Sequence, residues 1–141
     1  MSAILNKGSV FDYFDEVRKV VQTAKMDIFF IDAYLDADFV SRYLPHITQG
    51  TTIRLLTKKC LSTLIPAVDL LRVQNGLKIE VRHSADFHDR YLIIDKRDCF
   101  QSGASFKDGA KHAPTTFTQV TDAFTAVADI YEKIWSTASP K

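Results

Sequence analysis

The sequence predicts an α/β domain spanning residues 1–141, with a mixed, mostly parallel central sheet flanked by helices on both faces. The first observation behind this prediction is the order of the apolar segments, which alternate between strand and helix patterns before ending in paired strands and a last helix. The second is that several strand candidates are apolar on both faces, which is typical of a covered sheet. A chain of 141 residues, of which 46% are hydrophobic, is long enough to bury such a core.

The first half of the chain supplies the alternating segments. Val17 and Val21 follow Ser9, a typical N-cap residue, at helical spacing. Short β-rich apolar runs predict buried strands, and Asn75-Gly76 is a typical helix stop. In order, we expect a helix from Ser9 to about Lys25, a strand over 26–32, a helix from a capping Asp36 or Asp38 to near Pro45, a strand over 51–57 and a helix over 61–76.

The second half contains the paired strands and the closing helix. Alternation of apolar and polar residues over 77–83 predicts a half-exposed strand, and a polar turn at 96–98 separates two further strand candidates. Near the C-terminus, Val127, Ile130 and Tyr131 lie on one side of a predicted helix. In order, we expect strands over 77–83, 87–95 and 98–105, a loop over 103–114, a strand over 115–120 and a helix over 121–139.

Composition narrows the classes of function. With 18 basic and 17 acidic residues the net charge is +1, so any polyanion would have to bind a local cluster. No N-terminal stretch resembles a signal peptide, and no run approaches the ~20 apolar residues of a membrane span. Cys60 and Cys99 are therefore expected to be reduced thiols in a cytoplasmic protein. His46, His83 and His112 lack the spacing of metal ligands, so no metal site is expected.

The segment "FHDRYLIID", residues 87–95, is unusual for a buried strand because it carries polar groups at its start. Side chains alternate along a strand, so His88 and Arg90 would share one face while Asp95 points to the other. A guanidinium binds phosphate oxygens by a bidentate fork, and an imidazole can act as a nucleophile or proton carrier. Two simpler interpretations stay open: His88 as a hydrogen-bonded structural histidine, and Arg90 in a salt bridge with Asp89 or Asp95.

These residues resemble a known signature. His88-x-Arg90-x4-Asp95 is similar to the HxKx4D motif of the phospholipase D superfamily, with Arg in the Lys position. Six residues later, "SGAS" (102–105) resembles that superfamily's small-residue motif, with Ser105 where Asn is usual. The likeness extends over most of the chain, and its informative part is 87–108. It implies that the chain is one phospholipase D-like half.

The resemblance implies a mechanism and a set of site residues. Family members bring two motifs together, so that one His forms a phosphohistidine while the other protonates the leaving oxygen and then activates water. This chain has one motif, which implies a homodimer with the site across its two-fold axis and no metal or cofactor. The implied catalytic residues are His88, Arg90, Asp95 and Ser105; Arg90, Ser105 and Lys107 are the implied phosphate ligands, and Asp32 is the candidate acid that orients His88.

Two functions are consistent with this sequence. The first is a dimeric phosphodiesterase of the phospholipase D type, acting on nucleic acid rather than lipid because the chain shows no lipid-docking helix. The second is an inactive module that binds the phosphate groups of nucleic acid or of a phospholipid headgroup, or that mediates dimerisation. The Arg90 and Ser105 replacements favour the second function, whereas the intact motif spacing favours the first. The sequence leaves open whether the domain works fused or bound to a larger effector.

Overall fold

Eight strands form one mixed sheet in the computed structural model, which describes residues 2–141. The strand order across the sheet is β1-β7-β6-β5-β2-β3-β4-β8. The strands are β1 (Ser2–Leu5), β2 (Asp27–Ile31), β3 (Thr52–Thr57), β4 (Lys78–His83), β5 (Tyr91–Ile94), β6 (Asp98–Ser102), β7 (Thr115–Val120) and β8 (Ser139–Pro140). The helices are α1 (Val10–Val21), α2 (Ala37–Tyr43), α3 (Leu61–Asn75) and α4 (Phe124–Thr137), with a short 3-10 turn, η1 (Leu44–His46).

The sheet confirms the α/β class and the mixed topology, but the expectation of a mostly parallel sheet is wrong. Only the β2–β3 and β3–β4 pairs are parallel, because α2 and α3 cross back over the sheet between these strands. The other five pairs between described residues are antiparallel. Between β4 and β7 the connections contain no helix, and β5 and β6 form a hairpin that pairs with β2 on one side and β7 on the other.

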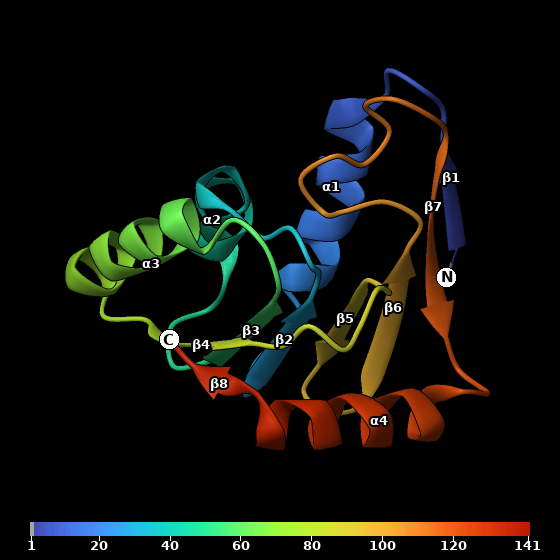
Figure 1. Cartoon of the computed structure of the whole chain (residues 1–141). Coiled ribbons are helices and arrows are strands. Elements are labelled where there is room, and N and C mark those ends of the chain that lie inside the picture. Colours follow the sequence, from blue (N-terminus) through green and yellow to red (C-terminus); the bar gives the residue numbers. More distant parts are fainter. Residues whose placement is uncertain (1) are drawn as a thin grey trace.

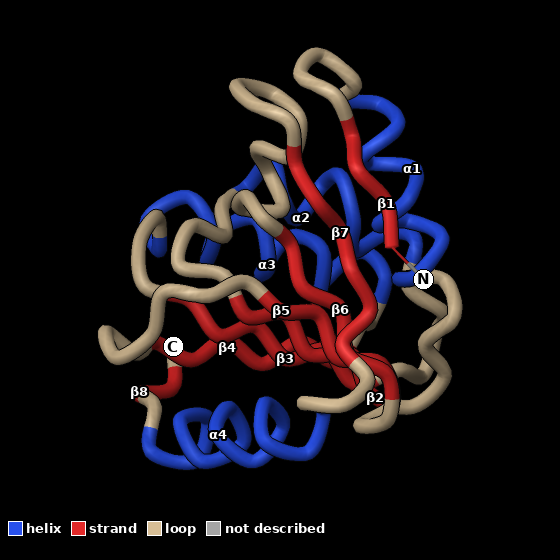
Figure 2. The backbone as a smooth tube through the Cα atoms, turned by 90° about the vertical axis from the view of Figure 1, so that its right-hand side faces the viewer, coloured by secondary structure: helices blue, strands red, loops and turns tan. Residues whose placement is uncertain are grey.

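Helices cover both faces of the sheet, as predicted. Helices α1, α2 and α3 pack on one face over a large core that includes Phe30, Leu55 and Phe117. Helix α4 lies on the other face, where Tyr131 and Trp135 pack in a smaller core. Figure 1 shows this arrangement, with α4 below the central strands, and Figure 2 shows the sheet between α4 and the other three helices. Among the described residues, no helix combines the length and apolarity needed to cross a bilayer.

Several element bounds differ from the predictions for identifiable reasons. The terminal strands β1 and β8 were not expected, since four and two residues carry too little pattern to recognise without their partners β7 and β4. Helix α1 ends at Val21, and a turn leads from there into β2. Asp36 rather than Asp38 caps α2, its carboxylate accepting from the Phe39 N–H at 3.0 Å. Ile130 was placed on the buried side of the last helix but is 56% exposed.

Candidate functional site

The candidate site lies where three strands end at one edge of the sheet. In the antiparallel register, Ile31 of β2 is opposite Tyr91 of β5, and Tyr91 is opposite Gln101 of β6. One step beyond these residues, toward the same edge of the sheet, are Asp32 after β2, Arg90 before β5 and Ser102 on β6. The Ser102 N–H donates to the Arg90 carbonyl at 3.1 Å. Pairing of β5 between β2 and β6 thus brings together residues that are up to 70 positions apart.

His88 and Arg90 lie in the loop before β5, not on the strand predicted over 87–95. The strand begins only at Tyr91, so strict alternation does not determine the directions of these two side chains. The His88 side chain is exposed and makes no hydrogen bond or ion pair with any other residue between 2 and 141. Such an imidazole is available to a ligand, which argues against the structural-histidine interpretation.

Arg90 is turned toward the loop that follows β6. Its Nη2 donates to the Gly103 carbonyl at 2.8 Å, and its Nε donates to the Ser102 carbonyl at 3.4 Å. The guanidinium therefore contacts main-chain oxygens rather than Asp89 or Asp95, and the suggested salt bridge is not formed. These contacts fix the guanidinium at the edge of the sheet, beside the loop that carries Ser105.

Asp32 holds Ser105 in place instead of orienting His88. Asp32 is completely buried, and its Oδ2 accepts from the Ser105 hydroxyl and the Phe106 N–H, both at 2.8 Å. Burial raises the pKa of Asp32. This effect is partly offset by hydrogen bonds from the Tyr34 N–H, the Phe106 N–H and the Ser105 hydroxyl, and by the positive charge of Arg90. The acid proposed to orient His88 is thus a buried anchor for the 102–110 loop.

Tyrosine side chains from two helices also hold this loop. The hydroxyls of Tyr13 and Ser102 are hydrogen-bonded at 2.6 Å, and the Tyr43 hydroxyl donates to the Phe106 carbonyl at 3.0 Å. Burial raises the pKa of both phenols, so they stay protonated and able to donate. Gly109 lies directly against the Tyr13 ring. The sequence analysis missed both tyrosines because it predicted α1 from the spacing of apolar residues and α2 from its capping Asp and Pro45, and neither pattern assigns a role to a tyrosine hydroxyl.

Lys107 lies beside the anchored loop and is less free than a surface lysine. Its Nζ is 3.3 Å from Asp36 Oδ2 and 5.9 Å from the centre of the Tyr34 ring. Partial burial would lower the pKa of Lys107, but attraction to Asp36 raises it, so the ammonium stays charged. Its main-chain carbonyl accepts from Arg42 Nη1 at 3.0 Å. A phosphate at this position would have to compete with Asp36 for the ammonium.

Asp95, the third residue of the motif, is remote from the other motif residues. It follows β5 at the opposite end of the strand from Arg90, and its Oδ1 accepts from the N–H groups of Lys25, Met26 and Asp27 at 2.7–3.1 Å. Partial burial acts to raise the pKa of Asp95, but these hydrogen bonds outweigh it and lower the pKa. Asp95 therefore connects the β5–β6 turn to the start of β2.

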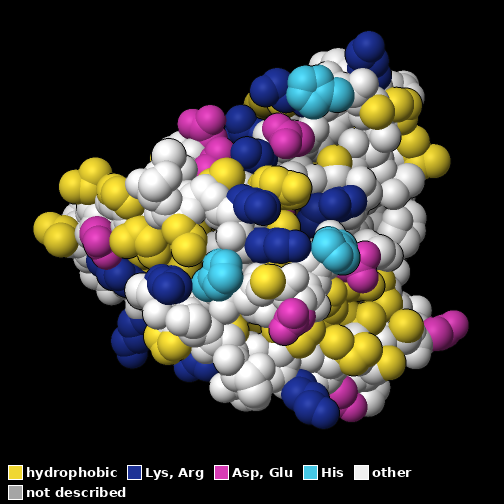
Figure 3. Space-filling model, in the orientation of Figure 1, with side chains coloured by type: hydrophobic (Ala, Val, Ile, Leu, Met, Phe, Trp, Pro, Cys, Tyr) yellow, Lys and Arg dark blue, Asp and Glu magenta, His cyan; other side chains and the backbone are white. Residues whose placement is uncertain are grey.

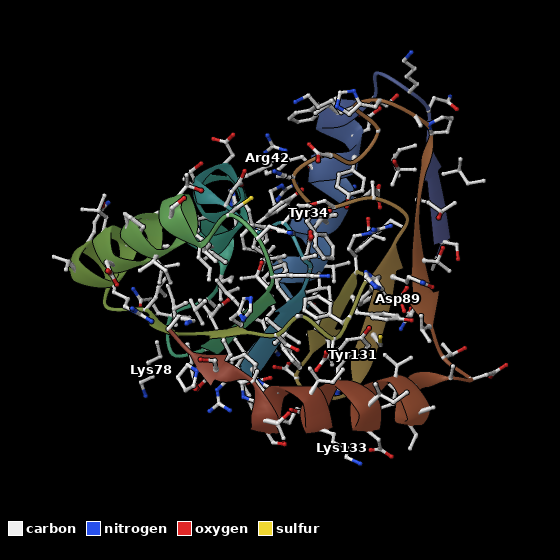
Figure 4. The ribbon with its side chains drawn as sticks, in the orientation of Figure 1. Tyr34, Arg42, Lys78, Asp89, Tyr131 and Lys133 are labelled. Atoms are coloured by element: carbon white, nitrogen blue, oxygen red, sulfur yellow. The ribbon has the colours of Figure 1, made fainter. Side chains whose placement is uncertain are left out.

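Several basic side chains lie near the three strand ends. Lys58 and Lys59 follow β3, and neither forms an ion pair with the described part of the chain. Figure 3 shows Lys and Arg side chains with two His side chains near the middle of this face, and Figure 4 labels Tyr34 and Asp89 on the same view. Within residues 2–141, no group of three or more His, Cys, Asp or Glu side chains is placed to hold a metal ion. The local charge is therefore suited to an anion despite the nearly neutral chain.

Comparison with known proteins identifies the fold. No protein-family model matches the chain, and no curated protein sequence matches it. Among solved structures, Nuc from Salmonella typhimurium, a phospholipase D family member, superimposes with a TM-score of 0.69 at 11% identity, covering 100% of this chain and 97% of Nuc. NucT from Helicobacter pylori superimposes with a TM-score of 0.70 at 10% identity, covering 100% of this chain and 99% of NucT.

The chain therefore has a phospholipase D-like fold, in agreement with the resemblance of the 87–108 segment. TrmBL2, described as an archaeal chromatin protein with a novel mode of DNA binding, is also similar, with a TM-score of 0.68 at 13% identity. The match covers 99% of this chain but only 54% of TrmBL2, so this chain corresponds to about half of that protein.

Proposed function

We propose that this protein is a phosphodiesterase of the phospholipase D type that cleaves nucleic acid as a homodimer, with His88 as the nucleophile. The observation that carries the proposal is the exposed His88 imidazole, without a partner in the described chain, at the strand edge that also presents Arg90. Unpaired Lys58 and Lys59 nearby favour a polyanion over a single headgroup. The fold shared with Nuc, a phospholipase D family member, supports this chemistry.

The proposed reaction has two steps. In the first, the His88 imidazole attacks phosphorus and forms a P–N bond, the P–O bond to the leaving group breaks, and the leaving oxygen takes a proton from the second copy's His88. In the second, that neutral imidazole removes a proton from water, the hydroxide attacks phosphorus, and the P–N bond breaks. Arg90 and Lys107 would offset the charge on the non-bridging oxygens. One water is consumed, and both imidazoles return to their starting states.

The open part of the sheet supports the homodimer. Ala3 and Leu5 pack toward α1, so Ile4, which is 74% exposed, projects to the opposite face, where Figure 1 shows β1 and β7 standing clear of α4. Thr116, directly opposite Ile4 on β7, is also exposed. These exposed residues form a strip on this face that continues to Gln101 of β6. Gln101 pairs with Tyr91, and Tyr91 is three positions after His88 in the sequence. A second copy on this strip would lie next to the candidate site.

The experiment compares cleavage of plasmid DNA and of a chromogenic phosphodiester, both in EDTA, by wild type, His88→Ala and His112→Ala. His112 is also exposed, on the loop before β7, so its replacement controls for loss of a surface imidazole. We expect His88→Ala to lose activity by on the order of 10³-fold while His112→Ala keeps it. Equal activity in all three proteins would overturn the enzyme proposal.

Mixing wild type with His88→Ala tests the shared site. If one phosphoryl group needs both imidazoles, a mixed dimer is inactive, and activity at constant total protein falls with the square of the wild-type fraction. A linear fall, or a monomer in sedimentation analysis, would contradict the dimeric site.

The second candidate function, a phosphate-binding module without catalysis, is favoured by one specific contact. The Ser105 hydroxyl donates to Asp32 and is 8% exposed, so it is not directed to a ligand. The likeness to TrmBL2, described as a DNA-binding chromatin protein, is consistent with binding alone. DNA binding by wild type that His88→Ala retains, together with no cleavage by either protein, would select this function.

A further inference from the structure

A groove between α1 and α2 lies next to the candidate site and has no role in the reaction described above. It has a volume of about 630 Å³, within the range of ligand sites. Phe11 on its rim is 70% exposed, which is unusual for a phenylalanine. The groove is lined by Val10, Phe11, Phe14, Ser41, Arg42 and His46. No carboxylate lines it, and its charged or titratable groups are an arginine and a histidine.

The aromatic rings of the groove form a supported platform. The Phe11 and Phe14 ring centres are 6.0 Å apart, and His46 lies edge-on to Phe14 at 5.8 Å. Behind them, the buried Tyr43 ring contacts Phe14 at 5.7 Å, and its hydroxyl is held by the Phe106 carbonyl. Phe14 is thus fixed from beneath, while Phe11 presents its ring to solvent.

Arg42 connects this groove to the candidate phosphate site. It lines the groove, and its Nη1 donates to the main-chain carbonyl of Lys107 at 3.0 Å. The Lys107 ammonium lies beside the half-exposed ring of Tyr34. Figure 4 labels Arg42 and Tyr34 on the same face. Two cationic side chains, Lys107 and Arg42, therefore lie between the aromatic rings of Tyr34 and Phe11.

We propose that this groove binds an unpaired base of a single-stranded nucleic acid whose backbone passes Arg42 and Lys107 to the site at His88. The proposal rests on the proposed function for the position of the phosphate and deepens it by naming the strand form of the substrate. Proteins that bind single strands combine a basic track with aromatic rings on which bases stack. A duplex cannot supply such a base, because its rings are stacked within the helix.

Charge favours this occupant over a second copy of the chain. A two-fold contact with its axis at the groove would bring Arg42 close to the same residue of a second copy, which is unfavourable for like charges. A polyanion instead gains from the positive charge of Arg42. The groove also presents one strongly exposed ring, that of Phe11, on which a planar base can stack.

The test measures fluorescence anisotropy of labelled oligothymidylates in EDTA, with every protein carrying His88→Ala so that the probe is not consumed. The probes are a twelve-residue strand and a twelve-base-pair duplex. Phe11→Leu keeps apolar bulk but removes the aromatic plane, Phe11→Trp keeps the plane, and Val73→Ala changes a side chain on α3 that is 88% exposed.

We expect Phe11→Leu to weaken binding of the twelve-residue strand by about five-fold or more, with duplex binding unchanged. Phe11→Trp and Val73→Ala should bind like the parent protein. Wild-type-like binding by Phe11→Leu, an equal loss on the duplex, or no binding of the long strand would overturn the inference. The inference would also be overturned if Phe11→Leu dissociated a dimer, because the groove would then be a contact between two copies of the chain.

The outcome is separable from that of the proposed function. Cleavage that depends on His88, with no effect of Phe11→Leu on binding, would refute the groove alone. An effect of Phe11→Leu on single-strand binding alone, with no cleavage by wild type, would refute the enzyme and leave a binding protein for single strands.

Discussion

Replacing Asp95 with alanine should destabilise the fold although the motif places Asp95 among the site residues. Its carboxylate accepts hydrogen bonds from the main-chain N–H groups of Lys25, Met26 and Asp27. These hydrogen bonds connect the β5–β6 turn to the chain segment that leads from α1 into β2. The residues joined are 68 to 70 positions apart in the sequence. Asp95 also has a φ of 54°, in the left-handed region that aspartate tolerates better than alanine.

The two losses set the magnitude. Loss of a carboxylate that satisfies several main-chain N–H groups resembles loss of a helix N-cap, which costs about 0.5–2 kcal/mol. Alanine in the left-handed region adds about 1 kcal/mol. We therefore expect Asp95→Ala to lower the free energy of unfolding by about 1.5–3 kcal/mol. Asp95→Gly removes the carboxylate without the backbone penalty and should lie between wild type and alanine.

Urea denaturation at neutral pH measures these differences, and its pH dependence tests their origin. The folded state lowers the pKa of Asp95, so the stabilisation is present above the unfolded value of about 3.9 and is lost as the pH falls through the folded pKa. The gap between wild type and Asp95→Ala should narrow below about pH 4. Wild-type stability of Asp95→Ala at neutral pH, or a gap that widens in acid, would refute the reasoning.

Two further substitutions test the packing around the site and at the opposite end of the sheet. A Cβ at Gly109 would lie 2.2 Å from the Tyr13 ring, so Gly109→Ala should cost about 1–3 kcal/mol or more in urea denaturation; an unchanged midpoint would mean that the ring yields freely. Arg54 is 7% exposed and pairs with the buried Asp27 at 3.0 Å, so Arg54→Met should cost about 3–5 kcal/mol by leaving that carboxylate unpaired. Arg97→Met, which removes an exposed pair, should change the midpoint little, and equal effects of the two arginine variants would contradict this account.

The sequence predicted the part of the fold that depends on local periodicity. The helices and the strands β2 to β7 were expected near their observed positions, because burial of one face or both leaves a repeating pattern. Pairing partners leave no such pattern, since a strand of given composition can pair in either direction. The antiparallel insertion of β5 between β2 and β6 was therefore missed, and with it the strand β1, which exists through its pairing with β7.

The candidate site was predicted from residue types and spacing at His88 and Arg90, and from the resemblance of the 87–108 segment to the phospholipase D signature at Ser105. Their contacts could not be derived in this way. Asp32 was assigned to His88, yet it binds Ser105, because the loop after β6 folds back over the end of β2. Tyr13 has no signal in sequence at all, since its role arises from a hydrogen bond 89 positions away.

The amino-acid sequence by itself determined the α/β layering and the small set of polar residues at strand ends, because both follow from short-range periodicity and side-chain chemistry. Only the tertiary structure decided which of those residues meet. Asp95 lies at one end of β5 and Arg90 at the other, and the groove beside Lys107 forms between α1 and α2, whose packing against each other the sequence did not predict. The physical reason is that a contact between distant residues depends on strand order, register and loop path, which result from packing of the whole chain.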